Sequence, residues 1–495
     1  MLKPAVLFIL SASFCDPELQ AEFGPIPACC VPIGPNRLVD LQVKEAWDSI
    51  DNLQHVFVAL PIEKHCEARL VQGGSIWNVH MDSESMDATF HSLLQSFKLW
   101  CKVRKAQGAV FDDDEWIIHV LNGDTLIKVD KTVMNLEGTF NINKGEDTQP
   151  FVMSKEFDKP DTQCEYAGRL AFKFSHSSEA AYTYTELVRQ ATKIVIASEG
   201  WLDFGHLQTY YRSKRSLLSS RAFNTVSLEK ETGHIRKSGQ SEKIKAEKEW
   251  YRMLPPFTAM YTPRVVINND PSYLMEYLPY PTLAELLVHG SQGTDFWAHI
   301  ADKLETLLDL MREEAPHGIE FPDGLFLTKT KYRCVELSDK IRQPAEQLIE
   351  WLEQQKLPHN SAVLHGDLCF SNILYDRRSD SLKIIDPRGI TEDGEVFGNQ
   401  LYDVAKLYHS SEGMYDFAVA GSHPKEEANK ARALVSDKIL HYAQETLEVD
   451  RRTLTAVTAL LFYSMLPLHR DDMARVHRLS SAGQRLYNEW LRLGR

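Results

Sequence analysis

The chain has 495 residues, of which 43% are hydrophobic and 25% are charged, a composition that is ordinary for a soluble globular protein. This length exceeds the size at which single hydrophobic cores stop growing, so two or more domains are expected. The net charge of -14 argues against a general nucleic-acid binder, which is usually basic. It leaves room for a nucleotide substrate, whose charge Mg²⁺ and a few cations neutralise locally.

The N-terminal stretch MLKPAVLFILSASFC has two interpretations. One lysine, a short apolar run and small residues before Cys15 resemble a weak secretory or lipoprotein signal. The other interpretation, which we expect, is a buried first β-strand at residues 5–10. The run is too short to span a membrane, and no stable membrane insertion is expected. The eight cysteines form no C-x-x-C pair, which favours scattered reduced thiols in a cytoplasmic protein.

The first two hundred residues alternate between short apolar runs and longer amphipathic stretches. Continuous apolar runs of this length are typical of strands that are buried on both faces of a parallel sheet. The pattern predicts an α/β domain with a Rossmann-like, mostly parallel sheet. The runs lie at residues 5–10, 55–61, 116–124 and 193–197, and residues 87–107 form a candidate crossover helix.

The pattern changes after a basic, serine-rich segment at residues 210–221. Residues 222–239 alternate like antiparallel strands, and residues 241–254 read as a charged amphipathic helix. A short strand follows at residues 272–279, and long helical stretches then continue to the C-terminus. We place a domain boundary near residue 215.

The stretch VLHGDLCFSNILYDRRSDSLKIIDPRG, residues 363–389, carries three polar side chains at the ends of strand-like runs. Asp367 and Asn372 are five residues apart, so a compact loop could present both on one side. Asp386 ends a later apolar run. Mg²⁺ prefers one or two carboxylates together with phosphate oxygens, and a further carboxylate can deprotonate an attacking hydroxyl. The segment predicts a catalytic loop and a metal-binding loop that flank a hairpin.

This spacing resembles the aminoglycoside phosphotransferase and choline kinase group, whose members share the protein-kinase-like fold. The matching elements are the HGD of residues 365–367, Asn372 after four intervening residues, and Asp386. The resemblance implies that Asp367 is the catalytic base, that Asn372 binds Mg²⁺, and that Asp386 binds Mg²⁺ bridging the ATP phosphates. HGD in place of HRD favours small-molecule kinases over protein kinases.

Upstream residues match the same group in order. Lys237 resembles the strand lysine that contacts the ATP phosphates. Glu247 resembles its ion-pair partner on the following helix, and Glu249 is the alternative, because the helix register is open.

Residues 275–278, MEYL, resemble the hinge that binds adenine through its backbone, with Glu276 and Leu278 as the binding positions. Asp403 resembles a structural aspartate of the group. There is no good glycine-rich loop before Lys237. The HRD at residues 469–471 imitates a protein-kinase loop, but it follows Asp386 and is interpreted as a charge cluster at a helix end.

The first half also carries two acidic residues after apolar runs, Asp124 in VLNGDTLI and Asp203 in EGWLDFG. Ligands of open α/β sheets bind at the carboxyl ends of strands, where two carboxylates could hold Mg²⁺ against a triphosphate. The NGD and W-x-D-x-G stretches resemble the sugar-phosphate nucleotidyltransferase family, in which these aspartates are the metal ligands. That family has a glycine-rich loop with a basic residue after its first strand. Here the place reads SASFCDPELQAEFGPIPA, with Arg37 as a nearby cation.

Together these resemblances imply two domains, a nucleotidyltransferase-like domain over residues 1–212 and a bilobal α+β kinase-like domain over residues 213–495. They also imply two sequential reactions. The kinase would use ATP and Mg²⁺ to phosphorylate a sugar or small alcohol, and the first domain would join that phosphate to a nucleotide from a second NTP. Proteins of similar arrangement are associated with bacterial capsular polysaccharide synthesis. The expected partners are a small-molecule acceptor and nucleotides, not nucleic acid. Two alternatives stay open, a kinase with a binding-only N-terminal domain and a non-catalytic scaffold.

Overall fold

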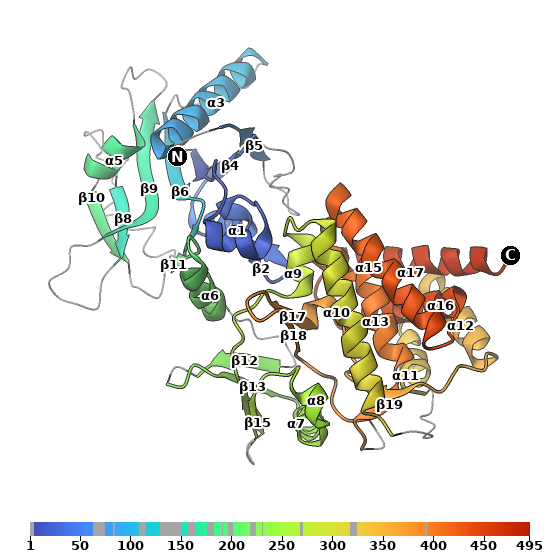
Figure 1. Cartoon of the computed structure of the whole chain (residues 1–495). Coiled ribbons are helices and arrows are strands. Elements are labelled where there is room, and N and C mark those ends of the chain that lie inside the picture. The colour runs from blue at the N-terminus through green and yellow to red at the C-terminus, as the bar shows by residue number, and fades with distance from the viewer. Residues whose placement is uncertain are drawn as a thin grey trace. The chain divides into compact units, whose positions relative to one another are not determined.

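The structure is a computed structural model. It describes residues 4–62, 75–82, 85–107, 115–128, 151–155, 165–175, 183–190, 192–196, 201–217, 224–229, 231–267, 271–316, 324–391 and 394–495. The chain divides into two compact units, Met1–Lys214 and Arg215–Arg495, which are drawn from blue to green and from green to red in Figure 1. Each unit is described by itself below.

The N-terminal unit is built on a seven-stranded mixed sheet. Strand β1 lies between β4 and β6 and is parallel to both, whereas β9 is antiparallel to its neighbours β6 and β8. In their spatial order the strands are β10 (Thr192–Ile196), β8 (Phe151–Lys155), β9 (Glu165–Ser175), β6 (Glu115–Asn122), β1 (Ala5–Leu10), β4 (Leu53–Leu60) and β5 (Ser75–His80).

Every residue of β1 is buried, because both faces of this central strand are covered. Val6, Phe8 and Leu10 join a core cluster with apolar side chains of helix α3. Leu7, on the opposite face, lines a small space together with side chains of α2. The continuous apolar run at residues 5–10 is therefore a strand, as expected, and its lack of alternation reflects burial on both sides.

Helices and short strands complete this unit. The helices are α1 (Pro17–Phe23), α2 (Leu38–Ser49), α3 (Met86–Ala106), α5 (Tyr184–Gln190) and α6 (Leu207–Ser216). The short strands are β2 (Pro32–Ile33), β3 (Asn36–Arg37), β7 (Thr125–Ile127) and β11 (Trp201–Asp203), of which β7 and β11 pair in an antiparallel ladder.

The C-terminal unit begins with a four-stranded antiparallel sheet in the order β12-β13-β15-β14. Helix α7 (Ser241–Met253) follows β13 and packs against β13 and β15. The strands are β12 (Asn224–Leu228), β13 (Ile235–Gly239), β14 (Val265–Val266) and β15 (Ser272–Met275). This small lobe confirms the antiparallel strands and the charged helix expected from the sequence.

The rest of the unit is a helical lobe. Helices α13 and α16 form its centre, and every residue of α13 is buried. The helices are α8 (Pro256–Ala259), α9 (Leu283–Val288), α10 (Thr294–Glu313), α11 (Gly324–Cys334), α12 (Asp339–Glu353), α13 (Leu401–Ser411), α14 (Tyr415–Ala420), α15 (Glu426–Glu445), α16 (Arg451–Met465) and α17 (Met473–Leu493). Among the residues that the structure describes, every helix is too short or too polar to span a lipid bilayer.

Two short ladders carry the central polar motifs of this lobe. Strand β16 (Ser361–Val363) pairs with β19 (Phe397–Asn399) and leads directly into the HGD turn. Strands β17 (Ile373–Asp376) and β18 (Ser381–Ile384) form an antiparallel hairpin between that turn and Asp386. The expected arrangement, two polar loops flanking a hairpin, is confirmed.

Candidate active site

A buried lysine joins three elements of the C-terminal unit. Lys237, on β13, places its Nζ 2.7 Å from Oε2 of Glu247 on α7, and it also contacts Oδ1 of Asp386. The hydroxyl of Tyr273 donates to the same Glu247 oxygen at 2.8 Å. Glu247 is thus the glutamate that meets Lys237, whereas Glu249 pairs with Arg252 on the helix surface.

The charges of this trio support one another. Burial lowers the pKa of Lys237, but the carboxylates of Asp386 and Glu247 outweigh burial and raise this pKa above its ordinary value. The Lys237 and Glu247 side chains are only 7% and 0% exposed, whereas Asp386 is 41% exposed. The lysine is therefore held as a cation, and only the Asp386 side of the trio opens toward solvent.

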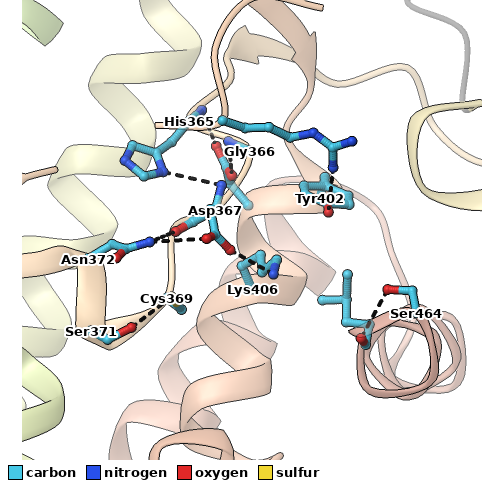
Figure 2. A network of polar contacts seen from close by, with 12 residues as sticks. His365, Gly366, Asp367, Cys369, Ser371, Asn372, Tyr402, Lys406 and Ser464 are labelled. Atoms are coloured by element: carbon cyan, nitrogen blue, oxygen red, sulfur yellow. Dashed lines mark hydrogen bonds and ion pairs between the residues drawn. The ribbon is translucent and has the colours of Figure 1, made fainter. Parts of the chain in front are cut away.

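Asp367 lies between two different partners. Its Oδ2 accepts a hydrogen bond of 3.2 Å from Nδ2 of Asn372, and its Oδ1 lies 2.8 Å from Nζ of Lys406. Figure 2 shows Asn372 on one side of Asp367, with Lys406 and Tyr402 on the other. The Asp367 carboxylate is 42% exposed, so a ligand can reach it while its orientation stays fixed.

The turn that presents Asp367 is held by a buried carboxylate. The backbone N–H groups of His365 and Gly366 donate to Oδ2 and Oδ1 of Asp403, at 2.7 and 2.9 Å. Burial raises the pKa of Asp403 to about 7, although these two hydrogen bonds and Lys406 act in the opposite direction. Asp403 therefore fixes the loop and does not face a substrate, in keeping with the structural role expected of it.

His365 ties the two polar loops together. Its Nε2–H donates to the carbonyl of Ile385 at 3.1 Å, and its Nδ1 accepts the N–H of Asp367 at 3.3 Å. Burial lowers the pKa of His365 to about 4, so the ring is neutral and suits one donor and one acceptor. The Arg388 N–H donates to the His365 carbonyl at 2.9 Å, which adds a backbone link between the loops.

The loop after β18 approaches α7 closely. Gly389 has φ +100°, and a Cβ at this position would lie 2.7 Å from the carbonyl carbon of Ala246. Asp386 itself has φ +59°, which is uncommon for a residue other than glycine. Only glycine allows this approach, and the approach brings Asp386 to Lys237.

Lys406 is a site residue that sequence reasoning missed. Burial lowers the pKa of Lys406, but Asp367, Tyr402 and Cys369 together outweigh burial and raise this pKa, so the lysine stays charged. Lys406 lies three residues after Asp403 in YDVAKL, so both side chains lie on one face of α13. That spacing was the available signal. Because α13 is buried all round, however, the sequence shows no polar stripe that would single the lysine out.

The hinge candidates follow β15 directly. The N–H of Glu276 donates to the carbonyl of Arg264 at 2.9 Å, and the described part of the chain holds no hydrogen-bond partner for the backbone of Leu278. Among the described residues the N–H of Leu278 is therefore available to a ligand, whereas the N–H of Glu276 is already used.

The donor set of this site fits Mg²⁺. Asn372 directs its Nδ2 to the carbonyl and the carboxylate of Asp367, which leaves its Oδ1 as an oxygen ligand. Asp386 adds a partly exposed carboxylate. No three His, Cys, Asp or Glu side chains gather as a metal centre in the described ranges. Two protein oxygens suit an ion that takes its remaining ligands from phosphates and water.

The two acidic candidates of the N-terminal unit also meet. Asp124 lies in the turn between β6 and β7, and its carbonyl accepts the N–H of Phe204 at 2.8 Å. A Cβ on Gly205 would lie 3.0 Å from Oδ2 of Asp124 and 3.2 Å from Oδ1 of Asp203, so both carboxylates face one small space. Burial, and then the charge of Asp203, raises the pKa of Asp124.

Two charged residues of the segment after β1, Arg37 and Asp16, contact other side chains or backbone groups. Arg37 binds Asp40 at 2.9 Å and so is held by its own helix. Asp16 caps α1 and lies 3.4 Å from Nδ1 of His206. These contacts orient Arg37 toward Asp40 and Asp16 toward α1 and His206.

Comparison with known proteins locates one family in the chain. Residues 232–432 match the family model of the phosphotransferase enzyme family, APH. These residues are an APH phosphotransferase domain. The APH domain contains Lys237, Glu247, Asp367, Asn372 and Asp386, and the kinase-like fold expected for this half is confirmed.

Several solved structures are similar to the chain. Aminoglycoside-3'-phosphotransferase of type VIII is 17% identical, with a TM-score of 0.34, over 50% of this chain and 92% of that chain. Choline kinase from Cryptosporidium parvum Iowa II is 12% identical, with a TM-score of 0.34, over 56% of this chain and 87% of that chain. A nucleoside-diphosphate-sugar pyrophosphorylase from Vibrio cholerae RC9 is 11% identical, with a TM-score of 0.28, over 42% of this chain and 99% of that chain. No curated protein matched.

A second buried carboxyl lies near the loop that follows the HGD turn of the APH domain. Asp416 is buried on α14, and its Oδ2 has no hydrogen-bond partner among the described residues. Burial raises its pKa from 3.8 to about 7, although a hydrogen bond from Ser410 lowers it. The hydroxyl of Ser410 also accepts the N–H of Phe370 at 3.0 Å, which connects Asp416 to the loop.

Asp416→Asn should therefore change the pH dependence of stability. The pKa of Asp416 is higher in the folded protein than in the unfolded chain. The wild type should therefore lose stability relative to the variant as the pH rises from about 4 to 7. Each pKa unit corresponds to about 1.4 kcal/mol. Urea midpoints across this range measure the difference, with exposed Asp437→Asn as the control. Parallel curves for Asp416→Asn and wild type would contradict the assignment.

Proposed function

We propose that the APH domain transfers the γ-phosphoryl group of ATP to a hydroxyl of a sugar or a small alcohol. The observation that carries the proposal is the fixed, partly exposed carboxylate of Asp367, whose two oxygens contact Asn372 and Lys406. A loop held by Asp403 presents this carboxylate, and a second loop brings Asp386 to Lys237.

In this proposal each residue has one task. Asp367 accepts the proton of the acceptor hydroxyl while the hydroxyl oxygen forms a bond to the γ-phosphorus of ATP. The bond from that phosphorus to the oxygen it shares with the β-phosphate breaks, and ADP leaves. Lys237 binds the phosphates. Mg²⁺, held by Asn372 and Asp386, would neutralise charge on them. Most of the acceleration would come from positioning and electrostatics.

The hinge supplies the adenine contacts in the same proposal. The backbone of Leu278, and with it the carbonyl of Glu276, would hydrogen-bond the base. Phosphoryl transfer from ATP needs a supply of nucleotides, which favours the cytoplasm as the location of the protein.

The test is Mg²⁺-dependent ADP release with a panel of sugars, polyols and amino alcohols. Asp367→Ala should reduce acceptor-stimulated release by about 10²–10⁴-fold, because a positioned general base contributes about this much. The matched control is Asp471→Ala, which removes the aspartate of the HRD at residues 469–471 and should leave release unchanged. A folded Asp367→Ala protein with full activity would end the assignment.

A second activity is favoured by the paired carboxylates of Asp124 and Asp203. We propose that residues 1–212 are a nucleotidyltransferase domain that binds Mg²⁺ and a second NTP there and joins the NTP to a sugar phosphate. The phosphate oxygen would attack the α-phosphorus, and pyrophosphate would leave. In one chain with the kinase, this step would supply an activated precursor of surface polysaccharide.

Pyrophosphate release tests this second activity. CTP, UTP, GTP and dTTP would each be supplied with Mg²⁺ and the phosphorylated product of the kinase step. One NTP should release pyrophosphate, and Asp124→Asn should abolish the release. Wild-type protein that releases none with any of the four would favour the alternative of a binding-only domain.

A further inference from the structure

Positive side chains gather on the side of Asp367 that faces away from Asn372. Lys406 contacts Oδ1 of Asp367 on this side. Tyr402, one helical turn earlier on α13, lies on the same side of Asp367 as Lys406 (Figure 2). Nη1 of Arg388 approaches the hydroxyl of Tyr402 at 3.4 Å. This side is where an acceptor must enter, because the other oxygen of Asp367 faces Asn372 and the metal ligands.

Arg388 is built into the site. Its N–H is bonded to the carbonyl of His365, and its stem lies against Gly366. A Cβ on Gly366 would meet the Arg388 Cβ at 2.8 Å, and Gly366 has φ +74°. The glycine of HGD thus makes room for the Arg388 stem, and this packing holds the guanidinium near the catalytic loop.

Arg333 approaches the same region from α11. Its Nη1 donates to the carbonyl of Ser464, at the end of α16, with a donor–acceptor distance of 3.3 Å. Burial, and then the charge of Arg388, lowers the pKa of Arg333, whereas Tyr402 and Asp367 raise it. No carboxylate of the described chain forms an ion pair with either Arg333 or Arg388, although the protein as a whole is acidic.

Two guanidinium groups that form no ion pair with any described carboxylate, near the proposed catalytic base, favour an anion. We propose that the acceptor carries a carboxylate or a phosphate group in addition to its reactive hydroxyl, and that Arg388 and Arg333 bind this group. Guanidinium forks match both oxyanions with paired hydrogen bonds. The anion would also relieve the repulsion between the two arginines. An acceptor with an ammonium group would be repelled.

This inference rests on the proposed kinase activity, but the anion site itself can be tested without catalysis. The first experiment follows the melting temperature with added sodium sulfate, at constant ionic strength set with sodium chloride. Sulfate at low millimolar concentration should stabilise the wild type. Arg388→Gln and Arg333→Gln should each weaken apparent sulfate binding by about tenfold, since each removes a charged hydrogen-bond donor.

Arg378→Gln, which removes an exposed arginine from the turn between β17 and β18, is the matched control and should bind sulfate like the wild type. Equal stabilisation in all four proteins, or none in the wild type, would overturn the anion site. A sulfate effect that the two site variants lose, without turnover of any alcohol, would support the site and contradict the kinase activity instead.

The second experiment compares glycerol, glycerate, glycerol 3-phosphate and ethanolamine as acceptors in ADP release. Glycerate or glycerol 3-phosphate should be preferred over glycerol and ethanolamine. The preferred one of the two shows whether the site binds a carboxylate or a phosphate. Arg388→Gln should raise KM for the preferred acceptor by about tenfold. Preference for glycerol or ethanolamine, with an unchanged KM in Arg388→Gln, would overturn the proposal.

Discussion

The ion pairs of Lys237 are the constraint on which the candidate active site depends. A lysine that is 7% exposed must be paired, and its partners come from α7 and from the loop after β18, far apart in sequence. Glu247 holds the ammonium from one side, and Asp386 meets it from the other. The contact therefore fixes the small lobe, its helix and the proposed metal ligand in one arrangement.

A second set of contacts carries this constraint to Asp367. Asp403 binds two consecutive N–H groups of the HGD turn, and His365 bridges from that turn to Ile385, one residue before Asp386. Moving either loop would break buried hydrogen bonds, each of which costs about 1–3 kcal/mol when a partner is left unsatisfied. The proposed base and the proposed metal ligands are thus positioned before any substrate binds, which is the main requirement of phosphoryl transfer.

Much of this arrangement could be predicted from sequence because it depends on local patterns. The run at residues 5–10 indicated a strand buried on both faces, and the hairpin between Asn372 and Asp386 followed from two strand-like runs. The order of Lys237, Glu247, Asp367, Asn372 and Asp386 indicated the kinase-like fold through resemblance. Spacing alone, however, left Glu249 as an alternative to Glu247, and the ion pair of Glu247 with Lys237 distinguishes them.

What could not be predicted depends on tertiary contacts. Strand β9 was not expected, and its antiparallel pairing with β6 and β8 makes the first sheet mixed. Lys406 lies in a helix that is buried all round, so no polar stripe marks it. The contact between the Arg388 stem and Gly366 joins residues from two loops, and only the folded chain shows why this turn reads HGD.

The central claim is that Asp386 and Asn372 bind the metal of a Mg-nucleotide at Lys237. Calorimetric titration of ATP with and without Mg²⁺, in wild type and Asp386→Asn, tests this claim without requiring the acceptor. We expect the wild type to bind ATP in a Mg²⁺-dependent manner and Asp386→Asn to bind Mg-ATP about tenfold or more weakly. Equal affinity of the two proteins for Mg-ATP, or no binding by the wild type, would contradict the account.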